Sequence, residues 1–421
     1  MGLSRRARGF ATGASAFAAT LLAISFVSLS TADAASIVDQ GSIPKISKVS
    51  TSNVVGETMV TPASVDSYWT PERMASAKPA EMPDPAGSLD IPDFGSDASV
   101  SAATGDFTPG NVTSFPQIVH GKIFFSVGAS NFSCSGTVID SANANVVFTA
   151  GHCVYDQTSG AFVTNFIFVP GYENGSAPFG GSPAVNLYTT NQWATNGSNA
   201  YDLGVAVLQD PVQDTVSSRQ IAFDLNPKGR EYTIYGYPSK PSALFDGEIL
   251  RGCKAAFTTY DSSDANVKPY PMGAKPCNMQ QGASGGGWVT LGNYVNSVVS
   301  YGYCDSLPQY CGIIFGPIFS NAAKSLYVQA GGSSAPTIKL LSAPPKVVRK
   351  RKVSFKFGGT AATLLGFSCK LDRQKAVNCS QKISITRLSP GKHTLKVRAV
   401  DQTGHQSAKQ ITRNFRVILP R

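Results

Sequence analysis

Three short segments of this chain contain the residue types that activate a hydroxyl nucleophile. His152 lies in Thr-Ala-Gly-His-Cys, Asp202 in Tyr-Asp-Leu-Gly-Val and Ser284 in Gly-Ala-Ser-Gly-Gly. A serine hydroxyl is a poor nucleophile at neutral pH unless an imidazole takes its proton. A carboxylate can fix the imidazole tautomer and stabilise the imidazolium ion. The order His, Asp, Ser, with separations of 50 and 82 residues, therefore predicts acyl transfer through an activated serine.

These segments resemble the catalytic motifs of chymotrypsin-like serine proteases, especially secreted bacterial members, over about residues 115–330. The resemblance implies that His152 is the general base, Asp202 the orienting acid and Ser284 the nucleophile. It also implies that the backbone N–H groups of Gly282 and Ser284 form the oxyanion hole, which stabilises the charge of the tetrahedral intermediate.

The same resemblance indicates the substrate-binding residues. Asn278 lies six residues before the nucleophile, where trypsin carries Asp, so cleavage after Arg or Lys is not supported. Bacterial glutamyl endopeptidases use a His at the position that Val299 occupies here. We therefore expect a neutral or apolar side chain before the cut. The segment that resembles the partner of the substrate backbone consists of Ser300, Tyr301 and Gly302.

The residue before the nucleophile departs from the family pattern. Animal members often carry Asp there, which pairs with a newly freed N-terminal amine during activation, whereas this chain has Ala283. Such a switch cannot operate with alanine. A pro-segment would therefore act in another way, either by assisting folding or by covering the cleft.

The region around these motifs is rich in short β-type runs. They are separated by clusters of Gly, Pro and Asn such as residues 178–183. This pattern predicts an all-β fold, either a sandwich or a pair of barrels. The resemblance selects two six-stranded Greek-key barrels with the active site between them. The clearest runs are Lys122–Val127, Gly136–Ile139, Val146–Phe148 and Tyr232–Tyr235.

The N-terminal segment has the features of a signal peptide at residues 1–34. Arginines at positions 5, 6 and 8 precede an apolar stretch at about 16–27, and Ala32-Asp33-Ala34 is a cleavage signal. The apolar stretch is too short to span a membrane comfortably. We expect a secreted, extracellular protein without a transmembrane anchor.

Residues 35–108 differ in composition from the region that contains the three motifs. Ser, Ala, Pro and Asp are frequent, and residues 35–106 contain ten acidic and four basic side chains. We expect a largely irregular pro-segment, and hence a zymogen, although a passive linker to the cell surface is the alternative. One short helix is predicted, with Thr70 as its N-cap and Pro71 in its first turn.

The chain has eight cysteines, an even number that suits an oxidising compartment. Cys and His residues are not clustered as a zinc site requires, and the motifs need no cofactor. Sequence order and the family resemblance imply four disulfides: Cys134–Cys153, Cys253–Cys277, Cys304–Cys311 and Cys369–Cys379.

Beyond a Gly-Gly-Ser-Ser-Ala-Pro segment at 331–336 the charge changes sharply. Residues 333–421 contain 19 Lys and Arg but two acidic residues, whereas the preceding 332 residues contain 17 Lys and Arg and 24 Asp and Glu. Several alternating strands give one apolar and one cationic face. Segments 369–372 and 391–401 and Cys379 resemble parts of the small immunoglobulin-like β-sandwich domains appended to secreted bacterial proteins. The cationic face suits anionic wall polymers, membranes, extracellular DNA or acidic substrates, unless the module is a spacer.

We therefore predict a monomeric secreted serine endopeptidase, with residues 109–332 as the catalytic domain and 333–421 as a basic module. Its expected partners are protein or peptide substrates, with anionic cell-wall or surface polymers at the module and no specific nucleic acid. Two alternatives remain. One is a catalytically silent adhesion protein with the protease fold, and the other is an esterase with the same three residues.

Overall fold

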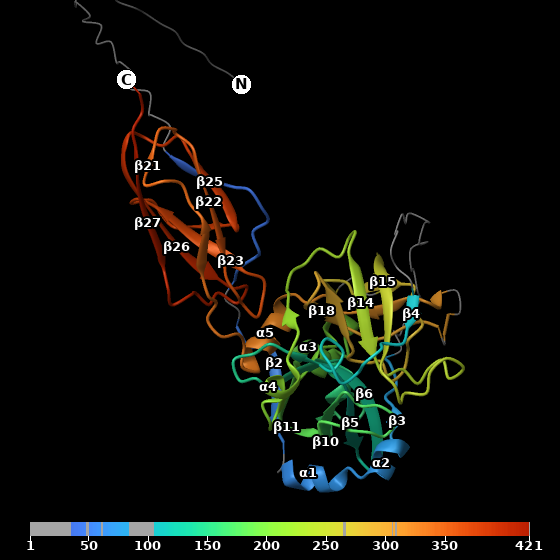
Figure 1. The fold of residues 1–421 in the computed structure, drawn as a ribbon. Helices are drawn as coiled ribbons and strands as arrows, with labels where there is room; N and C mark the ends of the chain where they lie inside the picture. The colour runs from blue at the N-terminus through green and yellow to red at the C-terminus, as the bar shows by residue number, and fades with distance from the viewer. Residues whose placement is uncertain are drawn as a thin grey trace, which may run out of the picture.

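The computed structural model describes residues 35–47, 50–59, 62–83, 105–263, 267–304, 306–307 and 310–420. The expected signal peptide lies outside these residues. In this part of the chain, no helix is both long and apolar enough to cross a membrane. A larger N-terminal unit adjoins a smaller, elongated unit formed mainly by the C-terminal strands (Figure 1).

The first sheet of the larger unit contains a closed six-stranded barrel. Strand β10 pairs with both β5 and β11, which closes the order β10-β5-β6-β7-β12-β11. Three of the β-type runs expected from the sequence fall in these strands. The barrel strands are β5 (His120–Val127), β6 (Ser130–Ile139), β7 (Val146–Thr149), β10 (Thr164–Pro170), β11 (Ser182–Thr190) and β12 (Gly204–Leu208).

The second sheet has the order β13-β18-β17-β14-β15-β16-β19. Among the described residues, the strand pairs do not close this sheet into a barrel. An isolated bridge joins Tyr301, which lies beyond β18, to Phe315 of β19. The all-β prediction is confirmed, whereas a second closed barrel stays a prediction. The strands are β13 (Gln220–Ile221), β14 (Glu231–Gly236), β15 (Arg251–Tyr260), β16 (Met272–Lys275), β17 (Gly287–Thr290), β18 (Tyr294–Val298) and β19 (Ile314–Gly316).

The described part of the expected pro-segment adds strands to other sheets. Strand β1 (Ser36–Asp39) pairs with β25 of the smaller unit, and β2 (Val54–Thr58) pairs with β11. Strand β3 (Lys78–Pro79) pairs with β6, and β4 (Gly105–Phe107) pairs with β15. This segment is therefore integrated into both units.

The predicted helix after Thr70 is confirmed as α2 (Pro71–Ser76). The Thr70 hydroxyl accepts a hydrogen bond from the Arg73 N–H at 3.3 Å, and Pro71 opens the helix. The other helices are α1 (Pro62–Tyr68), α3 (Asn191–Asn196), α4 (Val212–Val216) and α5 (Asn321–Gln329). Two short 3-10 helices are η1 (Gly151–Cys153) and η2 (Asn199–Tyr201). A separate two-stranded sheet is formed by β8 (Tyr155–Asp156) and β9 (Ala161–Phe162).

One hydrophobic cluster joins the two sheets of the larger unit. It contains Phe124, Val205, Tyr235 and Val289, so both sheets share a core. Trp69, which follows α1, is 6% exposed and packs against Phe124 with ring centroids 5.4 Å apart. Burial of such an aromatic side chain contributes about 3–5 kcal/mol to stability. The N-terminal helices are thus anchored to the first barrel.

The smaller unit consists of two sheets around one buried cluster, with the orders β1-β25-β22-β20 and β21-β27-β26-β23-β24. The expected strands of this region are present, while its immunoglobulin-like classification stays a prediction. The strands are β20 (Lys339–Ser342), β21 (Val347–Val348), β22 (Val353–Gly358), β23 (Gly366–Leu371), β24 (Val377–Cys379), β25 (Lys382–Thr386), β26 (Gly391–Val400) and β27 (Ile411–Val417).

Candidate active site

His152 and Asp202 are brought together by two neighbouring strands. His152 lies in η1, just after β7, and Asp202 lies just before β12, which pairs with β7. One carboxylate oxygen of Asp202 accepts from His152 Nδ1 at 2.8 Å, and the other accepts from the His152 backbone N–H at 2.8 Å. These two bonds fix the imidazole and direct Nε2 away from the carboxylate.

Asp202 is completely buried and has a third partner. Ser300 Oγ donates to the carboxylate oxygen that contacts His152, at 2.5 Å. A buried carboxylate is costly unless it accepts hydrogen bonds, and three donors here lower that cost. Gly151 permits this close approach, because a Cβ there would lie 2.9 Å from Asp202 Oδ1 and 2.8 Å from the Trp193 ring.

Ser284 lies on a loop that is attached to the first barrel. Its carbonyl oxygen accepts from the Ser135 N–H at 2.7 Å and lies 3.7 Å from Cys153 Sγ, next to His152. Both Ser284 Oγ and His152 Nε2 are buried and lack a hydrogen-bond partner among the described residues. A nucleophile and base often approach closely only when substrate binds. The two atoms are therefore available for reaction.

The backbone before Ser284 has a conformation that requires glycine. Gly282 has φ +91°, and a Cβ there would lie 2.5 Å from the Tyr237 carbonyl oxygen. Its own carbonyl oxygen accepts from Ser135 Oγ at 2.8 Å. Within the described part of the chain, the N–H groups of Gly282 and Ser284 donate no hydrogen bond. These two donors thus remain free for an anionic oxygen.

The other expected substrate-binding residues lie nearby, but their polar groups are mostly paired. The backbone N–H and side-chain amide of Asn278 donate to Asp106 of β4, at 3.1 and 2.7 Å. The hydroxyls of Tyr301 and Tyr303 both donate to one oxygen of Asp261. Burial raises the pKa of both tyrosines, so these groups act as neutral donors.

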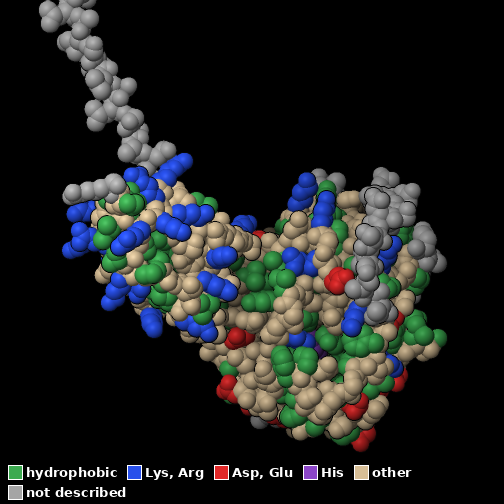
Figure 2. All heavy atoms as spheres, turned by 45° about the horizontal axis from the view of Figure 1, so that its top comes forward, with side chains coloured by type: hydrophobic (Ala, Val, Ile, Leu, Met, Phe, Trp, Pro, Cys, Tyr) green, Lys and Arg blue, Asp and Glu red, His purple; other side chains and the backbone are tan. Residues whose placement is uncertain are grey.

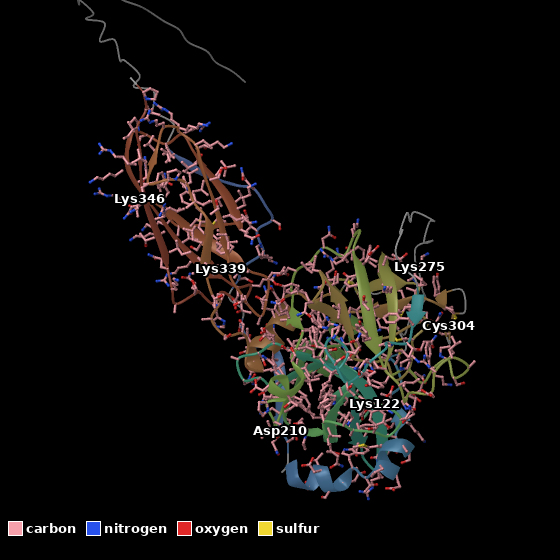
Figure 3. The ribbon with its side chains drawn as sticks, in the orientation of Figure 1. Lys122, Asp210, Lys275, Cys304, Lys339 and Lys346 are labelled. Carbon is pink, nitrogen blue, oxygen red and sulfur yellow. A yellow bond between two sulfur atoms is a disulfide. The ribbon has the colours of Figure 1, made fainter. Side chains whose placement is uncertain are left out.

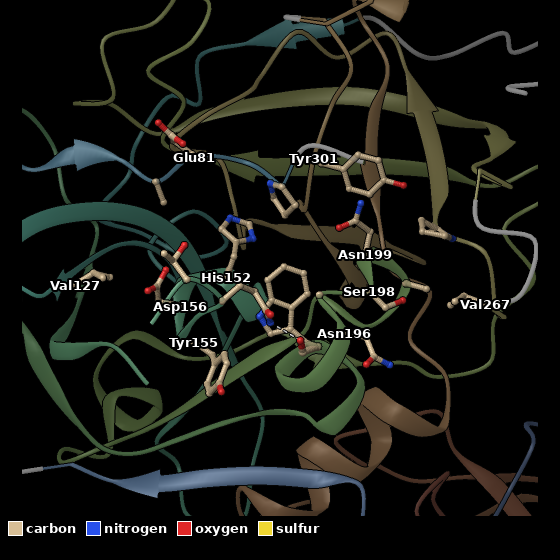
Figure 4. A pocket seen from close by; sticks show the side chains of 18 of the residues that line it. Glu81, Val127, His152, Tyr155, Asp156, Asn196, Ser198, Asn199, Val267 and Tyr301 are labelled. Carbon is tan, nitrogen blue, oxygen red and sulfur yellow. Dashed lines mark hydrogen bonds between the residues drawn. The ribbon is translucent and has the colours of Figure 1, made fainter. Parts of the chain in front are cut away.

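An open pocket adjoins His152. Its lining includes Phe125 and Trp193 from the first barrel region and Tyr301 and Asp261 from the second sheet. Figure 4 places Glu81 and Tyr301 on one side of His152, and Tyr155 and Asn196 on the other. The pocket therefore lies between the two sheets, beside His152.

Sequence reasoning missed three residues of the site. Ser135 secures the Ser284 loop, the Trp193 ring centroid lies 6.3 Å from that of His152, and Asp261 holds the two tyrosines. Ser135 adjoins Cys134, so the Ser-Cys-Ser-Gly segment could have indicated that Ser135 lies near the catalytic residues. Trp193 and Asp261 lie in no motif.

All eight cysteines form the four expected disulfides. Figure 3 labels Cys304 of one of them in the larger unit. Among the described residues, two groups have the composition of a metal site, Cys134-His152-Cys153 and Asp106-Cys253-Cys277. Both include a disulfide, so their sulfur atoms are not free thiolates.

A β-barrel fold in which a hydrogen-bonded His–Asp pair adjoins the loop of a buried serine is typical of serine hydrolases related to chymotrypsin. Residues 111–318 match the Trypsin family model, and the chain belongs to the trypsin-like serine protease family.

Several known proteins are similar to parts of the chain. A glutamyl endopeptidase of Bacillus licheniformis is 33% identical over 136 residues, which are 32% of this chain and 40% of that protein. An extracellular metalloprotease of Bacillus subtilis is 29% identical over 132 residues, 30% of this chain and 41% of that protein. The chain thus spans about two fifths of these curated relatives. The structure of protease Anisep from Arthrobacter nicotinovorans has 36% identity, a TM-score of 0.47, and coverage of 54% of this chain and 99% of that one.

Proposed function

We propose that this protein is a secreted serine endopeptidase that hydrolyses peptide bonds through His152, Asp202 and Ser284. The observation that carries the proposal is that the Asp202 carboxylate accepts hydrogen bonds from both the ring Nδ1 and the backbone N–H of His152, at 2.8 Å each. The loop of Ser284 lies against the neighbouring Cys153. The four disulfides and the similarity to an extracellular bacterial protease support an extracellular location.

The mechanism is acyl transfer in two steps. His152 Nε2 takes the proton of Ser284 Oγ while that oxygen attacks the peptide carbonyl carbon. The N–H groups of Gly282 and Ser284 stabilise the oxyanion. The C–N bond then breaks, and His152 gives its proton to the departing amine. Water, activated by the same imidazole, attacks the acyl-enzyme and releases the acid.

Asp202 acts through His152. Its carboxylate accepts from Nδ1, so Nε2 of the neutral ring carries the lone pair that can take the serine proton. The same carboxylate stabilises the imidazolium ion that forms in each step. An esterase would use the same groups, and a catalytically silent adhesion protein would not need Ser284 Oγ and His152 Nε2 to stay unpaired.

Labelling with a fluorophosphonate probe tests the proposal. The purified chain and a Ser284→Ala control are treated with probe and analysed by mass spectrometry. We expect stoichiometric modification at Ser284 and none in the control. Rates on matched peptide and ester substrates then separate a peptidase from an esterase. An unlabelled Ser284 in a chain whose fold is verified by circular dichroism would instead favour the adhesion protein.

The smaller unit carries a high positive charge. Lys and Arg side chains gather on it (Figure 2), among them Lys339 and Lys346, which Figure 3 labels. We propose that this unit holds the enzyme on anionic polymers of the cell surface. The net charge of +17 from 19 basic and two acidic residues at 333–421 supports this proposal.

A further inference from the structure

A segment of the N-terminal region lies along the candidate active site. Strand β3 pairs in parallel with β6, with Lys78 opposite Phe132 and Pro79 opposite Ser133. The next residue, Ala80, is 5% exposed and donates its N–H to the Ser133 carbonyl at 2.9 Å. Ser133 is followed on β6 by the cysteine bonded to Cys153 and by the serine that holds the Ser284 loop. The chain therefore enters the catalytic centre at Ala80.

The residues after Ala80 face two different environments. Glu81 is exposed, and both Glu81 and Pro83 line the open pocket together with His152. Met82, between them, is half-buried and is not part of that lining. Its side chain is instead partly buried against the protein, so the segment lines the site with one residue inserted.

The insertion point of Met82 lies between two hydrophobic clusters. One cluster includes Met279, Ala283 and Val299, and the other consists of Tyr301, Tyr303, Ile313 and Phe315. Met82 packs against both. The first cluster contains the residues that immediately precede Ser284 and Ser300, and the second contains those that follow Ser300. Met82 therefore packs against the clusters to which the chain before Ser284 and the chain on both sides of Ser300 belong.

We propose that the space holding Met82 is the primary specificity pocket, that it accepts long apolar side chains such as those of Met and Leu, and that residues 78–83 occupy it as an internal inhibitor. The inference rests on the proposed peptidase function and deepens it. In the intact chain the pocket is filled, so a substrate must displace Met82 before its carbonyl can reach Ser284. The full-length protein is therefore latent toward peptide substrates, whereas a small fluorophosphonate, which places no side chain in that pocket, still reaches Ser284.

The polar groups near the pocket favour this preference over a charged substrate residue. The Asn278 amide is bound to Asp106, and the Asp261 carboxylate already accepts two tyrosine hydroxyls. A charged side chain in the pocket would lose its water and would compete with donors that already engage these carboxylates, which is costly. Methionine has a flexible, polarisable side chain that fills such irregular apolar spaces.

The test compares intact full-length chains that carry single substitutions, with their intact masses verified. Met82→Gly removes the inserted side chain, and Met82→Asp replaces it with one that an apolar pocket rejects. Glu57→Gln is the matched control, because Glu57 is exposed in the same N-terminal region and lies outside the pocket lining. The assay uses short fluorogenic peptides with Met, Leu, Arg or Glu before the cut. We expect both Met82 variants to cleave the Met and Leu peptides at least about 10-fold faster than the parent chain, and the control to match the parent.

A synthetic peptide with the sequence of residues 76–83 provides a second measurement. It should inhibit the Met82→Gly chain, whereas the same peptide with Asp in place of its Met should not. Equal rates for parent and Met82 variants would overturn the internal inhibitor, and preferred cleavage after Arg or Glu would overturn the pocket assignment. Fluorophosphonate labelling distinguishes these results from a wider failure. A Met82→Asp chain without labelling at Ser284 would overturn the peptidase function and this inference together.

Discussion

Ser300 Oγ donates a 2.5 Å hydrogen bond to Asp202, on the same carboxylate oxygen that accepts from His152 Nδ1. The two residues are 98 positions apart and are both completely buried. Ser300 follows β18 of the second sheet, whereas Asp202 precedes β12 of the first. The bond therefore couples the two halves of the catalytic unit at the residue that orients the base.

Ser300→Ala should lower kcat of the peptidase about 10-fold with a smaller change in KM. The substitution removes a hydrogen bond to a charged group, which contributes about 1.5–3 kcal/mol, and leaves the carboxylate less restrained. Steady-state kinetics on one peptide substrate measure the effect. Ser198→Ala is the control, because Ser198 lines the pocket without contacting Asp202. A change confined to KM would show that Ser300 acts on substrate alone.

Asp202→Asn should reduce kcat by about 10⁴-fold, because an amide can donate to the imidazole and favour the wrong tautomer. The shape of the side chain is nearly conserved, so the fold should be retained. Circular dichroism and thermal unfolding verify the fold, and kcat measures the loss. Asp156→Asn, at a carboxylate that also lines the pocket, should leave kcat almost unchanged. A properly folded Asp202→Asn enzyme with near-normal kcat would contradict the proposed role of Asp202.

Short motifs were enough to predict which residues form the His–Asp pair, because each motif fixes a local conformation beside a strand end. The all-β class and the N-cap of α2 were predictable for the same reason. The pairing of β1 with β25 was not, since it joins residues about 350 positions apart and no local pattern encodes it. Asp261 was missed because its importance arises from two tyrosines, 40 and 42 residues away, which the second sheet brings to it.

His120 should make stability depend on pH. Arg219 donates to its Nε2 at 3.3 Å, and its Nδ1 lies 3.0 Å from Thr137 Oγ1. Burial, with the nearby Arg219 charge, lowers the pKa of His120 well below 6.5. Below pH 6.5 the unfolded chain therefore binds a proton that the folded protein does not. The stability is present above pH 6.5 and falls by up to about 1.4 kcal/mol per pH unit as pH decreases.

Thermal unfolding between pH 7 and 5 checks this dependence. We expect Tm of the parent protein to fall more steeply on acidification than Tm of His120→Gln, which cannot titrate in this range. The remaining ionisable groups are common to both proteins. Parallel curves would mean that His120 does not contribute the difference.

Gln402 should hold the smaller unit against the larger one. Its side-chain oxygen accepts from the Phe223 N–H at 3.0 Å, and its nitrogen donates to the Phe223 carbonyl at 2.8 Å. Gln402 is 1% exposed, so Gln402→Ala leaves two buried backbone groups without partners. Each costs about 1–3 kcal/mol. In a Ser284→Ala background, we expect faster cleavage near residues 331–336 by an added protease. Gln381→Ala, at an exposed glutamine, should cleave at the parent rate.

The cationic face of the smaller unit contains like charges directly opposite one another. Lys370 of β23 pairs in register with Lys396 of β26, and Lys392 of β26 pairs with Arg416 of β27. All four side chains are exposed. Such pairs are destabilising, by about 0.2–1 kcal/mol relative to neutral pairs. An anionic ligand along these strands would offset the repulsion, which is the physical basis for proposing a binding surface there.

Lys396→Glu therefore has two opposite expected effects. It converts the repulsive pair with Lys370 into an attractive one, so the free energy of unfolding should rise by up to about 0.5 kcal/mol. The same change should weaken retention on a dextran sulfate column, so that elution occurs at lower salt. Lys228→Glu is the matched control, because it changes the net charge equally at an exposed lysine of the larger unit. If both variants elute together, retention depends on net charge alone, and the anionic-polymer site on this face is wrong.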